Sequence, residues 1–287
     1  QDPRSIVLPE GSHPVILRAA HQVVRDGIAR PWLLGNKQEI KLLSEELHIS
    51  LEGIEILDPV ESPLFEQFSH KLFEMRARKG WSMDETRRQL RRRYVFGAMM
   101  VHEGIVDGQV HGIDRYYPDA IRPVLQVISK KPGVSKVSGA YLMVFRERSL
   151  LFADATVNFN PSAEELAEIA IQTAELAEYF DIKPRVAMLS FSNFGSTVHP
   201  EAARVKEAVD IARRRNPNLI IDGEMQADTA VTETILSKEY PFNRLGGSAN
   251  VLIFPNLSSG NIAYKLLERL GGAKVVGPLL MGISRPF

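Results

Sequence analysis

Three short polar stretches, each following an apolar run, carry the side chains best suited to chemistry. The first, residues 192–197, holds two serines, an asparagine, a glycine and a threonine around a phenylalanine, just before a proline at position 200. Hydroxyl groups, a glycine and the free amides of a helix N-terminus can together hold a phosphate group. Simple capping of the helix by a hydroxyl fits the same residues. Both interpretations stay open, and the candidate ligand contacts are Ser192, Asn193 and Ser196.

The second and third stretches differ in charge. Residues 256–261 are neutral and offer Ser258, Ser259 and Asn261 as candidate ligand contacts. Residues 222–228 contain three carboxylates, which could orient a thiol or bind a metal. No histidine accompanies them, and acidic residues favour helix N-termini in any case. We therefore expect no metal site.

No short motif identifies a reaction. The chain lacks a Walker lysine loop, a dinucleotide glycine fingerprint, a nucleophile elbow and a zinc-binding His-Glu helix. The only histidine at an expected strand end is His111, beside Gly112. A solvated helix face with acidic neighbours explains the run of basic side chains better than an anion site does. That run consists of Arg87, Arg88, Arg91, Arg92 and Arg93.

Composition restricts the class of protein. A chain of 287 residues is longer than one hydrophobic core usually serves, which favours two domains. Its 35 basic residues match 35 acidic ones, so it lacks the broad basic face that nucleic acid or an anionic membrane would require. The absence of cysteine excludes disulfides and thiolate chemistry and suits a reducing cytosol. No apolar run is long enough to span a bilayer, and we expect a cytoplasmic protein.

Strand-like and helical segments alternate along the chain, which predicts right-handed crossovers and parallel sheets. We expect two doubly wound α/β lobes around a cleft, with the boundary at the Lys-Lys-Pro-Gly break of residues 130–133. Ser162 and Glu165 stand at capping-box spacing at one helix start. The expected strands are residues 5–8, 31–35, 54–57, 106–110, 140–145, 150–157, 186–191, 219–221, 251–254 and 274–276. The expected helices are residues 14–28, 38–47, 63–79, 83–103, 118–128, 162–180, 200–215, 229–238 and 260–270.

The chain resembles the phosphotransacetylases (phosphate acetyl- and butyryltransferases) along nearly its whole length. The longest matching segment, residues 249–266, reads ANVLIFPNLSSGNIAYKL and continues into an Arg-Leu pair. So many matches in the same order are not expected by chance. The other matching segments are residues 8–11, 121–126, 151–154, 158–161 and 184–190.

The resemblance implies transfer of an acetyl group between coenzyme A and phosphate. It also implies an isocitrate/isopropylmalate dehydrogenase-like fold, with residues 1–131 and 279–287 in one lobe and 132–278 in the other. Homodimers or higher oligomers are expected, with acyl-CoA and a phosphate-like anion as ligands in the cleft between lobes. Arg76, Arg122 and Arg269 match the family's arginines, which would hold phosphate and the thioester oxygen.

Two segments depart from the family pattern: residues 111–119, and residues 192–196, in which Phe194 stands where a small residue is expected. Together with residues 222–228, they resemble the domain fused behind bacterial NADP-dependent malic enzymes. We therefore expect a regulatory, acetyl-CoA-binding domain without a cofactor of its own. NADP and a divalent metal would belong to an N-terminal malic enzyme region in the same polypeptide. Two alternatives remain: an active phosphate acetyltransferase, with the three arginines catalytic, and a purely structural assembly domain.

Overall fold

The computed structural model describes residues 2–113 and 117–286. The chain divides into two compact units, Gln1–Ser129 with Ser284–Phe287 (unit 1) and Lys130–Ile283 (unit 2). Each unit combines helices with a sheet that contains parallel strands, so the predicted mixed α/β architecture is confirmed. In the described part of the chain, no helix has the length and apolar character needed to cross a membrane.

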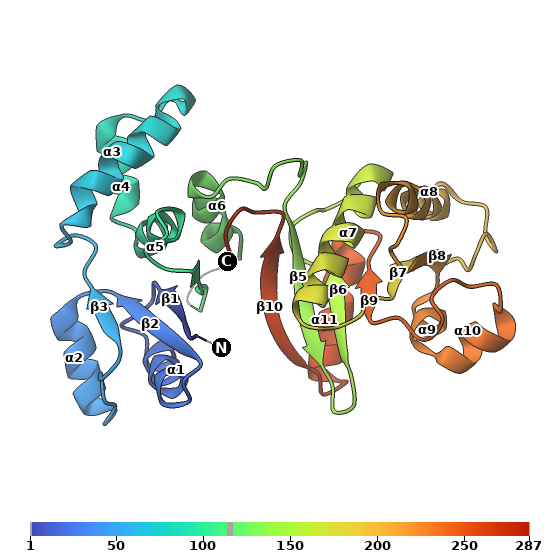
Figure 1. Cartoon of the computed structure of the whole chain (residues 1–287), viewed down its shortest axis with the longest axis horizontal. Coiled ribbons are helices and arrows are strands. Elements are labelled where there is room, and N and C mark those ends of the chain that lie inside the picture. Colours follow the sequence, from blue (N-terminus) through green and yellow to red (C-terminus); the bar gives the residue numbers. More distant parts are fainter. Residues whose placement is uncertain (1, 114–116, 287) are drawn as a thin grey trace. The chain divides into compact units, whose positions relative to one another are not determined.

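Unit 1 is built on a four-stranded parallel sheet with strand order β3-β2-β1-β4 (Figure 1). Apolar side chains of β1, β2, α1 and α2 form one core cluster around Leu17, Leu33 and Ile40, all fully buried. The strands are β1 (Arg4–Leu8), β2 (Ala29–Leu34), β3 (Glu55–Leu57) and β4 (Gly108–Gln109). The helices are α1 (Pro14–Arg25), α2 (Lys37–Glu46), α3 (Leu64–Arg76) with a 3-10 turn (Ala77–Lys79), α4 (Met83–Leu90), α5 (Arg93–His102) and α6 (Tyr117–Val127).

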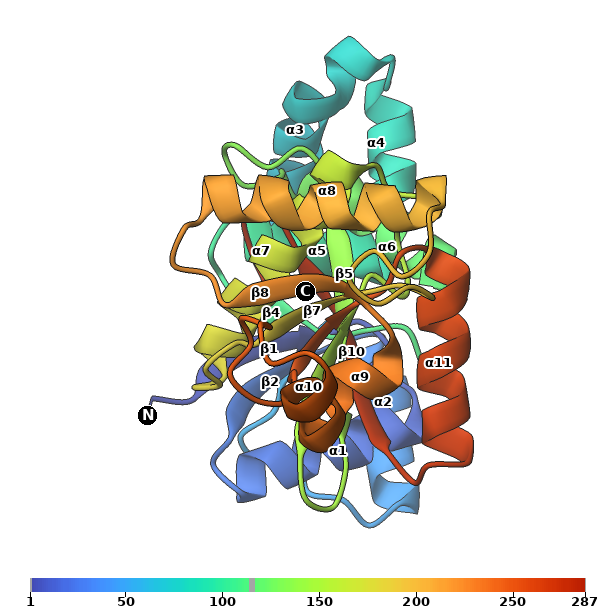
Figure 2. The ribbon, with the colours of Figure 1, turned by 90° about the vertical axis from the view of Figure 1, so that its right-hand side faces the viewer.

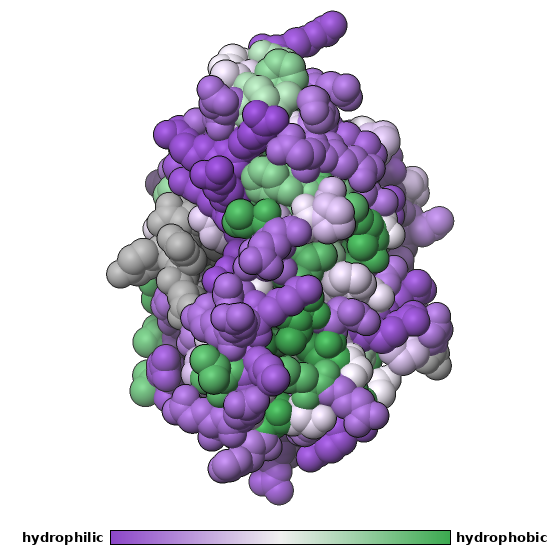
Figure 3. Space-filling model, turned by 90° about the vertical axis from the view of Figure 1, so that its left-hand side faces the viewer, coloured by the Kyte–Doolittle hydropathy of each residue, from purple (hydrophilic) through white to green (hydrophobic). Residues whose placement is uncertain are grey.

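The single helix predicted over residues 83–103 is wrong, because the structure has two. The break falls at Arg92, whose ψ of 120° is extended. No glycine or proline marks it. Instead, the two helices bury different amounts of surface: α4 is strongly charged, whereas α5 is buried on nearly all sides. Tertiary packing has overridden local helix propensity here. The end of the molecule that carries α3 and α4 shows a mostly hydrophilic surface (Figure 3).

Unit 2 contains a six-stranded sheet with strand order β10-β5-β6-β9-β7-β8. Strands β6, β9, β7 and β8 are parallel, and β5 and β10 are antiparallel to their neighbours. Helices α7 and α8 cover one face, while α9, α10 and α11 cover the other (Figure 2). The strands are β5 (Ser138–Val144), β6 (Ser149–Ala153), β7 (Val186–Leu189), β8 (Ile221–Met225), β9 (Val251–Ile253) and β10 (Lys274–Met281). The helices are α7 (Ala163–Tyr179), α8 (Pro200–Arg215), α9 (Ala227–Val231), α10 (Glu233–Glu239) and α11 (Leu257–Arg269).

In unit 2, the helix starts predicted from capping residues agree with the structure. The capping box of Ser162 and Glu165 is formed at the start of α7, and α8 has the predicted bounds. Three expectations were wrong. The acidic stretch begins inside β8 rather than in a turn, the stretch 256–261 is already the cap and first turns of α11, and the helix predicted over residues 229–238 is interrupted at Thr232.

Candidate functional site

Polar segments meet at the carboxyl edge of the parallel part of the unit 2 sheet. Strand β9 pairs with both β6 and β7, so the segments that follow these three strands are neighbours. Such edges are where ligands bind in open α/β sheets. The predicted stretches 192–197 and 256–261 follow β7 and β9, so the fold brings them to the same edge of unit 2.

A buried carboxylate organises the turn after β7. Glu224, on β8, is 1% exposed, and its Oε1 accepts hydrogen bonds from Ser192 Oγ at 3.0 Å and from the amide of Gly195 at 2.6 Å. Its backbone oxygen accepts from the amide of Phe194 at 2.8 Å. Ser192 Oγ also accepts from the amide of Thr197 at 3.2 Å, and Ser192 is fully buried. The Ser192 hydroxyl therefore supports the turn from inside, whereas Gly195, Ser196 and Thr197 are exposed.

A second set of bonds ties the same turn to the start of α9. Asn193 Oδ1 accepts from the amide of Gln226 at 2.7 Å, and Gln226 Nε2 donates to the backbone oxygen of Phe191 at 2.7 Å. Phe194 has a positive φ of 48°, and its ring packs against the rings of Tyr240 and Phe242. The bulky side chain that departs from the family pattern thus points into an aromatic cluster of unit 2. Sequence reasoning missed the anchoring roles of Glu224 and Gln226.

The neighbouring segment is the N-terminus of α11. Asn256 caps the helix by accepting from the amide of Ser259 at 3.0 Å, and the Ser259 hydroxyl donates back to the Asn256 backbone oxygen at 2.9 Å. Asn261 Nδ2 lies 3.5 Å from the backbone oxygen of Ala155. Ser258 is exposed. Of the three residues predicted here, Ser258 is the one whose side chain is open to solvent and not used in capping.

The end of β6 approaches α11 closely. A β-carbon on Gly260 would lie 2.9 Å from the backbone oxygen of Asp154, so only glycine fits this position without a shift. Asp154 is 2% exposed and accepts hydrogen bonds from the amides of Thr156 and Val157 and from the amide and side chain of Asn158. Burial raises the pKa of Asp154, and these hydrogen bonds oppose the shift. The edge is therefore built from polar groups that mostly satisfy one another.

The acidic stretch is used structurally. Asp222 accepts from Arg213 at 2.6 Å and from the amide of Arg244 at 2.7 Å. Asp228 accepts from the amide of Thr229 at 2.9 Å, near the start of α9. Within the described residues, no three acidic or histidine side chains are grouped as metal ligands would be.

The three family arginines lie at separate places. Arg76 ends α3, where its guanidinium lies 5.3 Å from the ring centroid of Trp81, and burial lowers its pKa. Arg122 is exposed on α6 of unit 1. Arg269 is exposed in the last turn of α11, eleven residues from Ser258, which puts it about 16 Å further along the helix. Within unit 2, Arg269 is therefore remote from the strand edge.

The predicted strand-end histidine in unit 1 is also in a polar network. Gln109 Nε2 lies 3.0 Å from His111 Nδ1, and the Tyr94 and His111 rings are stacked with their centroids 6.3 Å apart. The amide of Gly112 donates to Glu10 Oε1 at 2.8 Å. Residues 114–116 of the departing segment lie outside the described residues.

Comparison with known proteins covers the whole chain. The family model described as Phosphate acetyl/butaryl transferase matches residues 1–287. The phosphate acetyltransferase of Bacillus subtilis is 40% identical over 281 residues, which cover 98% of this chain and 87% of the relative. A phosphotransacetylase from Streptococcus pyogenes superposes with a TM-score of 0.92 at 39% identity, covering 99% of this chain and 87% of that one. The EutD phosphotransacetylase from Staphylococcus aureus gives 0.91 at 36% identity, with coverage of 99% and 87%.

These relatives correct one functional expectation. The prediction of a malic enzyme regulatory domain, with its keywords of oxidoreductase and NADP and its N-terminal malic enzyme partner, is wrong, because the proteins matched over almost their whole length are phosphate acetyltransferases. Phe194 lies in an aromatic cluster of unit 2, and residues 222–225 lie in strand β8. The chain belongs to the phosphate acetyl/butyryl transferase family.

Proposed function

We propose that this protein is a phosphate acetyltransferase, which moves an acetyl group from the sulfur of acetyl-CoA to an oxygen of inorganic phosphate and releases coenzyme A. The observation that carries the proposal is the similarity at about 40% identity to phosphate acetyltransferases along the whole chain. Acetyl-CoA and coenzyme A act as substrate and product, and the reaction needs no tightly bound cofactor.

The site must hold the phosphate against the thioester, and it must stabilise the negative charge that forms on the carbonyl oxygen. A phosphate oxygen attacks the thioester carbonyl carbon, and the carbonyl oxygen gains negative charge before the carbon–sulfur bond breaks. Fixed cations and helix N-terminal amides, aimed at the places where charge is carried, stabilise such a transition state. We propose that Arg122 and Arg269 supply the cations, with Arg76 adding positive charge. Both Arg122 and Arg269 are exposed and can reach a ligand.

We further propose that the unit 2 edge contacts the pantetheine portion of the substrate. Asn193 and Ser196 lie on the turn after β7, which Glu224 holds by a hydrogen bond from the amide of Gly195. Ser258 is exposed at the start of the 13-residue helix α11. Ser192, Ser259 and Asn261 would act mainly by holding these segments in place. Preorganised positions reduce the conformational entropy that substrate binding must overcome.

The wider expectations remain proposals. A homodimer is supported by an exposed apolar stripe on α11, formed by Ile262, Leu266 and Leu270 at four-residue spacing. Analytical ultracentrifugation should find a species of at least twice the monomer mass. The similarity to isocitrate and isopropylmalate dehydrogenases, a ligand cleft between the lobes, and a cytoplasmic location also stay predictions.

The test is phosphate-dependent release of coenzyme A from acetyl-CoA, followed with a thiol-reactive dye on the purified full-length protein. These 287 residues contain no cysteine and so add no thiol background. We expect release that needs phosphate and falls at least about 100-fold in Arg122→Ala, because a charge-assisted contact in the transition state is lost. Arg214→Ala, which removes an exposed arginine from the end of α8, is the matched control and should keep full activity. Absence of phosphate-dependent release would refute the proposal.

A further inference from the structure

The hydrogen bonds at the carboxyl edge of the unit 2 sheet form two groups. In the first, the turn 192–197 is held by Glu224 of β8 and by Gln226, just before α9. In the second, the segment after β6 is joined to the start of α11, where the amide of Leu257 donates to the backbone oxygen of Phe159 at 3.0 Å. Each group fixes its own segments. Beyond the pairing of β7 with β9, these bonds do not fix one group relative to the other.

Arg204 of α8 joins the two groups. Its Nη1 donates to the backbone oxygen of Pro161 at 2.7 Å, and its Nη2 donates to that of Pro255 at 3.2 Å. Pro161 belongs to the segment after β6, and Pro255 precedes Asn256, the cap of α11. Arg204 itself lies near the start of α8, the helix that follows the turn 192–197. One guanidinium group therefore connects the segments that follow β6, β7 and β9.

The Arg204 side chain reaches across the edge of the sheet. Helix α8 packs with α7 on one face, whereas α11 packs on the other (Figure 2). Glu201, also on α8, pairs with Arg204 Nη2 and holds the guanidinium in place. The Arg204 side chain is only 20% exposed, so its contacts are largely shielded from water. Such a contact fixes geometry better than an ion pair on an open surface does.

The two carbonyl groups depend on this arginine. In the described part of the chain, no amide and no other side chain donates to the backbone oxygen of Pro161 or Pro255. Pro161 is buried and Pro255 is half-buried, so the loss of the donor leaves polar groups poorly satisfied. A guanidinium offers several donors in one rigid plane, whereas an ammonium is a point charge on a flexible stem. A lysine could not hold both oxygens in the same geometry.

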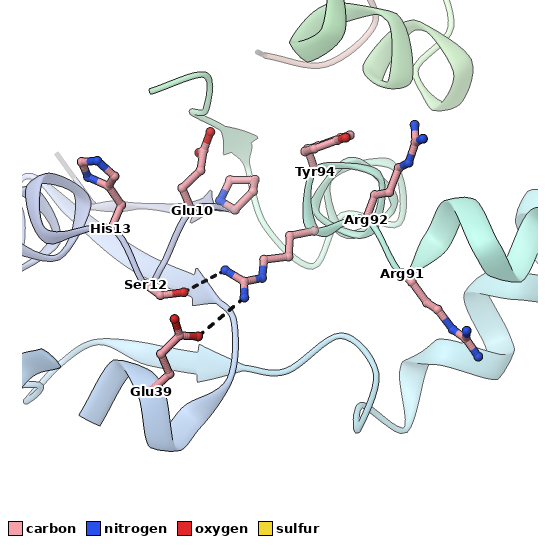
Figure 4. A pocket seen from close by; sticks show the side chains of 9 residues that line it. Glu10, Ser12, His13, Glu39, Arg91, Arg92 and Tyr94 are labelled. Atoms are coloured by element: carbon pink, nitrogen blue, oxygen red, sulfur yellow. Dashed lines mark hydrogen bonds and ion pairs between the residues drawn. The ribbon is translucent and has the colours of Figure 1, made fainter. Parts of the chain in front are cut away.

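Arginines beside a pocket of unit 1 make a different set of contacts. Arg93 donates to Ser12 Oγ at 2.9 Å and lies 3.9 Å from Glu39. Arg91 and Arg92 are exposed and point away from each other (Figure 4). These side chains end on other side chains or at the surface. Arg204 ends instead on the backbone of two separate segments, which is the contact expected of a group that sets their spacing.

We propose that Arg204 is a positioning residue for acetyl transfer, an inference that rests on the proposed function. It sets the distance between the turn that carries Asn193 and Ser196 and the helix start that carries Ser258, so that one substrate molecule contacts both. Arg204 touches no reacting atom. Its loss leaves the two groups free to shift, and the entropy of ordering them then opposes acetyl-CoA binding. The affinity for phosphate, assigned to other arginines, stays the same.

The test is steady-state kinetics of phosphate-dependent coenzyme A release by the full-length protein. In Arg204→Ala we expect the KM for acetyl-CoA to rise at least about tenfold, with the KM for phosphate within about twofold of the wild type. Arg204→Lys keeps the charge and can reach one of the two carbonyl groups, so its KM for acetyl-CoA should lie between those two values. Lys206→Ala removes an exposed cation from the same helix and should behave as the wild type does.

A merely structural role predicts another pattern. If Arg204 only stabilised the fold, Arg204→Ala would unfold at a lower temperature and contain fewer active molecules, which lowers the apparent kcat and leaves both KM values unchanged. Unchanged KM values, or equal increases for both substrates, would overturn the proposal. Should Arg204→Ala fail to fold, Arg204→Lys carries the same test, with an expected rise of about threefold in the KM for acetyl-CoA.

Calorimetric titration with coenzyme A separates this inference from the proposed function. Arg204→Ala should bind coenzyme A at least about tenfold more weakly than the wild type does. With that result, absence of acetyl transfer by the wild type would refute the proposed function and leave the positioning role intact. Equal affinity in the two proteins, or no binding to the wild type, would overturn the positioning role whether or not acetyl transfer occurs.

Discussion

The two units differ in how the polar side chains near the carboxyl ends of their parallel strands are paired. In unit 2, most polar groups at the carboxyl ends of the parallel strands satisfy one another: Glu224 Oε1 holds Ser192 and Gly195, and Asn256 caps α11. Glu224 Oε2 is buried without a hydrogen-bond partner among the described residues. In unit 1, the equivalent edge leaves Arg91 and Arg92 exposed beside an uncapped helix end. Mutually satisfied, buried groups fix the shape of a segment, whereas unmatched exposed charge favours binding of an ion from solution. The difference is that unit 2 fixes the shape of its edge through internal hydrogen bonds, whereas unit 1 leaves Arg91 and Arg92 exposed to solvent.

The largest effect should come from removing the carboxylate that organises the unit 2 edge. Glu224→Ala leaves the buried Ser192 hydroxyl and the Gly195 amide without their acceptor, and we expect the free energy of unfolding in urea to fall by about 3 kcal/mol. Turnover should fall by about 100-fold, because small displacements of positioned groups have effects of that size.

The conservative variant separates positioning from bulk stability. Glu224→Gln keeps an acceptor at Oε1, so we expect a loss of only about 1 kcal/mol. It should recover most of the turnover that Glu224→Ala loses. Equal activity in Glu224→Ala and the wild type would show that the turn does not need this anchor.

A smaller effect should follow from crowding the contact between α11 and β6. In Gly260→Ala, the new methyl group would lie 2.9 Å from the Asp154 backbone oxygen, which forces a shift of the helix start and should cost about 2 kcal/mol. Ser258→Ala, in the same turn but exposed, is the control for stability. It should stay within about 0.5 kcal/mol of the wild type in the same urea titration. A Gly260→Ala protein as stable as the wild type would contradict the close packing of this edge.

The smallest effect concerns an ion pair in unit 2 that is open to solvent. Glu165 Oε1 lies 2.9 Å from Lys136 Nζ, and that hydrogen bond, together with the amide of Ser162, lowers the pKa of Glu165. A lowered folded-state pKa gives stability above the unfolded value of about 4.5, and this stability is lost as the pH falls through the folded value. Glu165→Gln keeps the capping-box acceptor and should lose about 0.5 kcal/mol at pH 7. Thermal unfolding at pH 7 and pH 3 should show the difference only at pH 7, and an equal difference at both values would exclude this charge effect.

Local chemistry made much of the fold predictable from sequence. The structure agrees to the residue for the helix that begins at Pro200, and Ser162 forms the predicted capping box one residue before α7 begins. The errors fall where packing decides. Nothing local marks the break at Arg92, because it depends on how deeply α5 is buried. Residues 222–225, expected in a polar turn, lie in β8, where Glu224 is buried and bonded.

The candidate site was predictable only in outline. Polar stretches after apolar strands predict ligand contacts in residues 192–196 and 256–261, and the structure places both stretches after strands of unit 2. Their contact with a ligand stays a prediction. The sequence could not show which hydroxyl groups are internal, as at Ser192, or exposed, as at Ser258. The sequence also could not show which arginines of residues 87–93 form ion pairs, because the partners of Arg87 and Arg93 are distant along the chain.

The most direct measurement is phosphorus NMR of the full-length protein incubated with acetyl-CoA and inorganic phosphate, with the thiol released in the same sample titrated. The account predicts that acetyl phosphate appears, that it equals the coenzyme A released, and that neither forms when phosphate or protein is omitted. Coenzyme A without acetyl phosphate would indicate hydrolysis, and no change in either would mean that the chain does not transfer the acetyl group. Either result would contradict the assignment as a phosphate acetyltransferase.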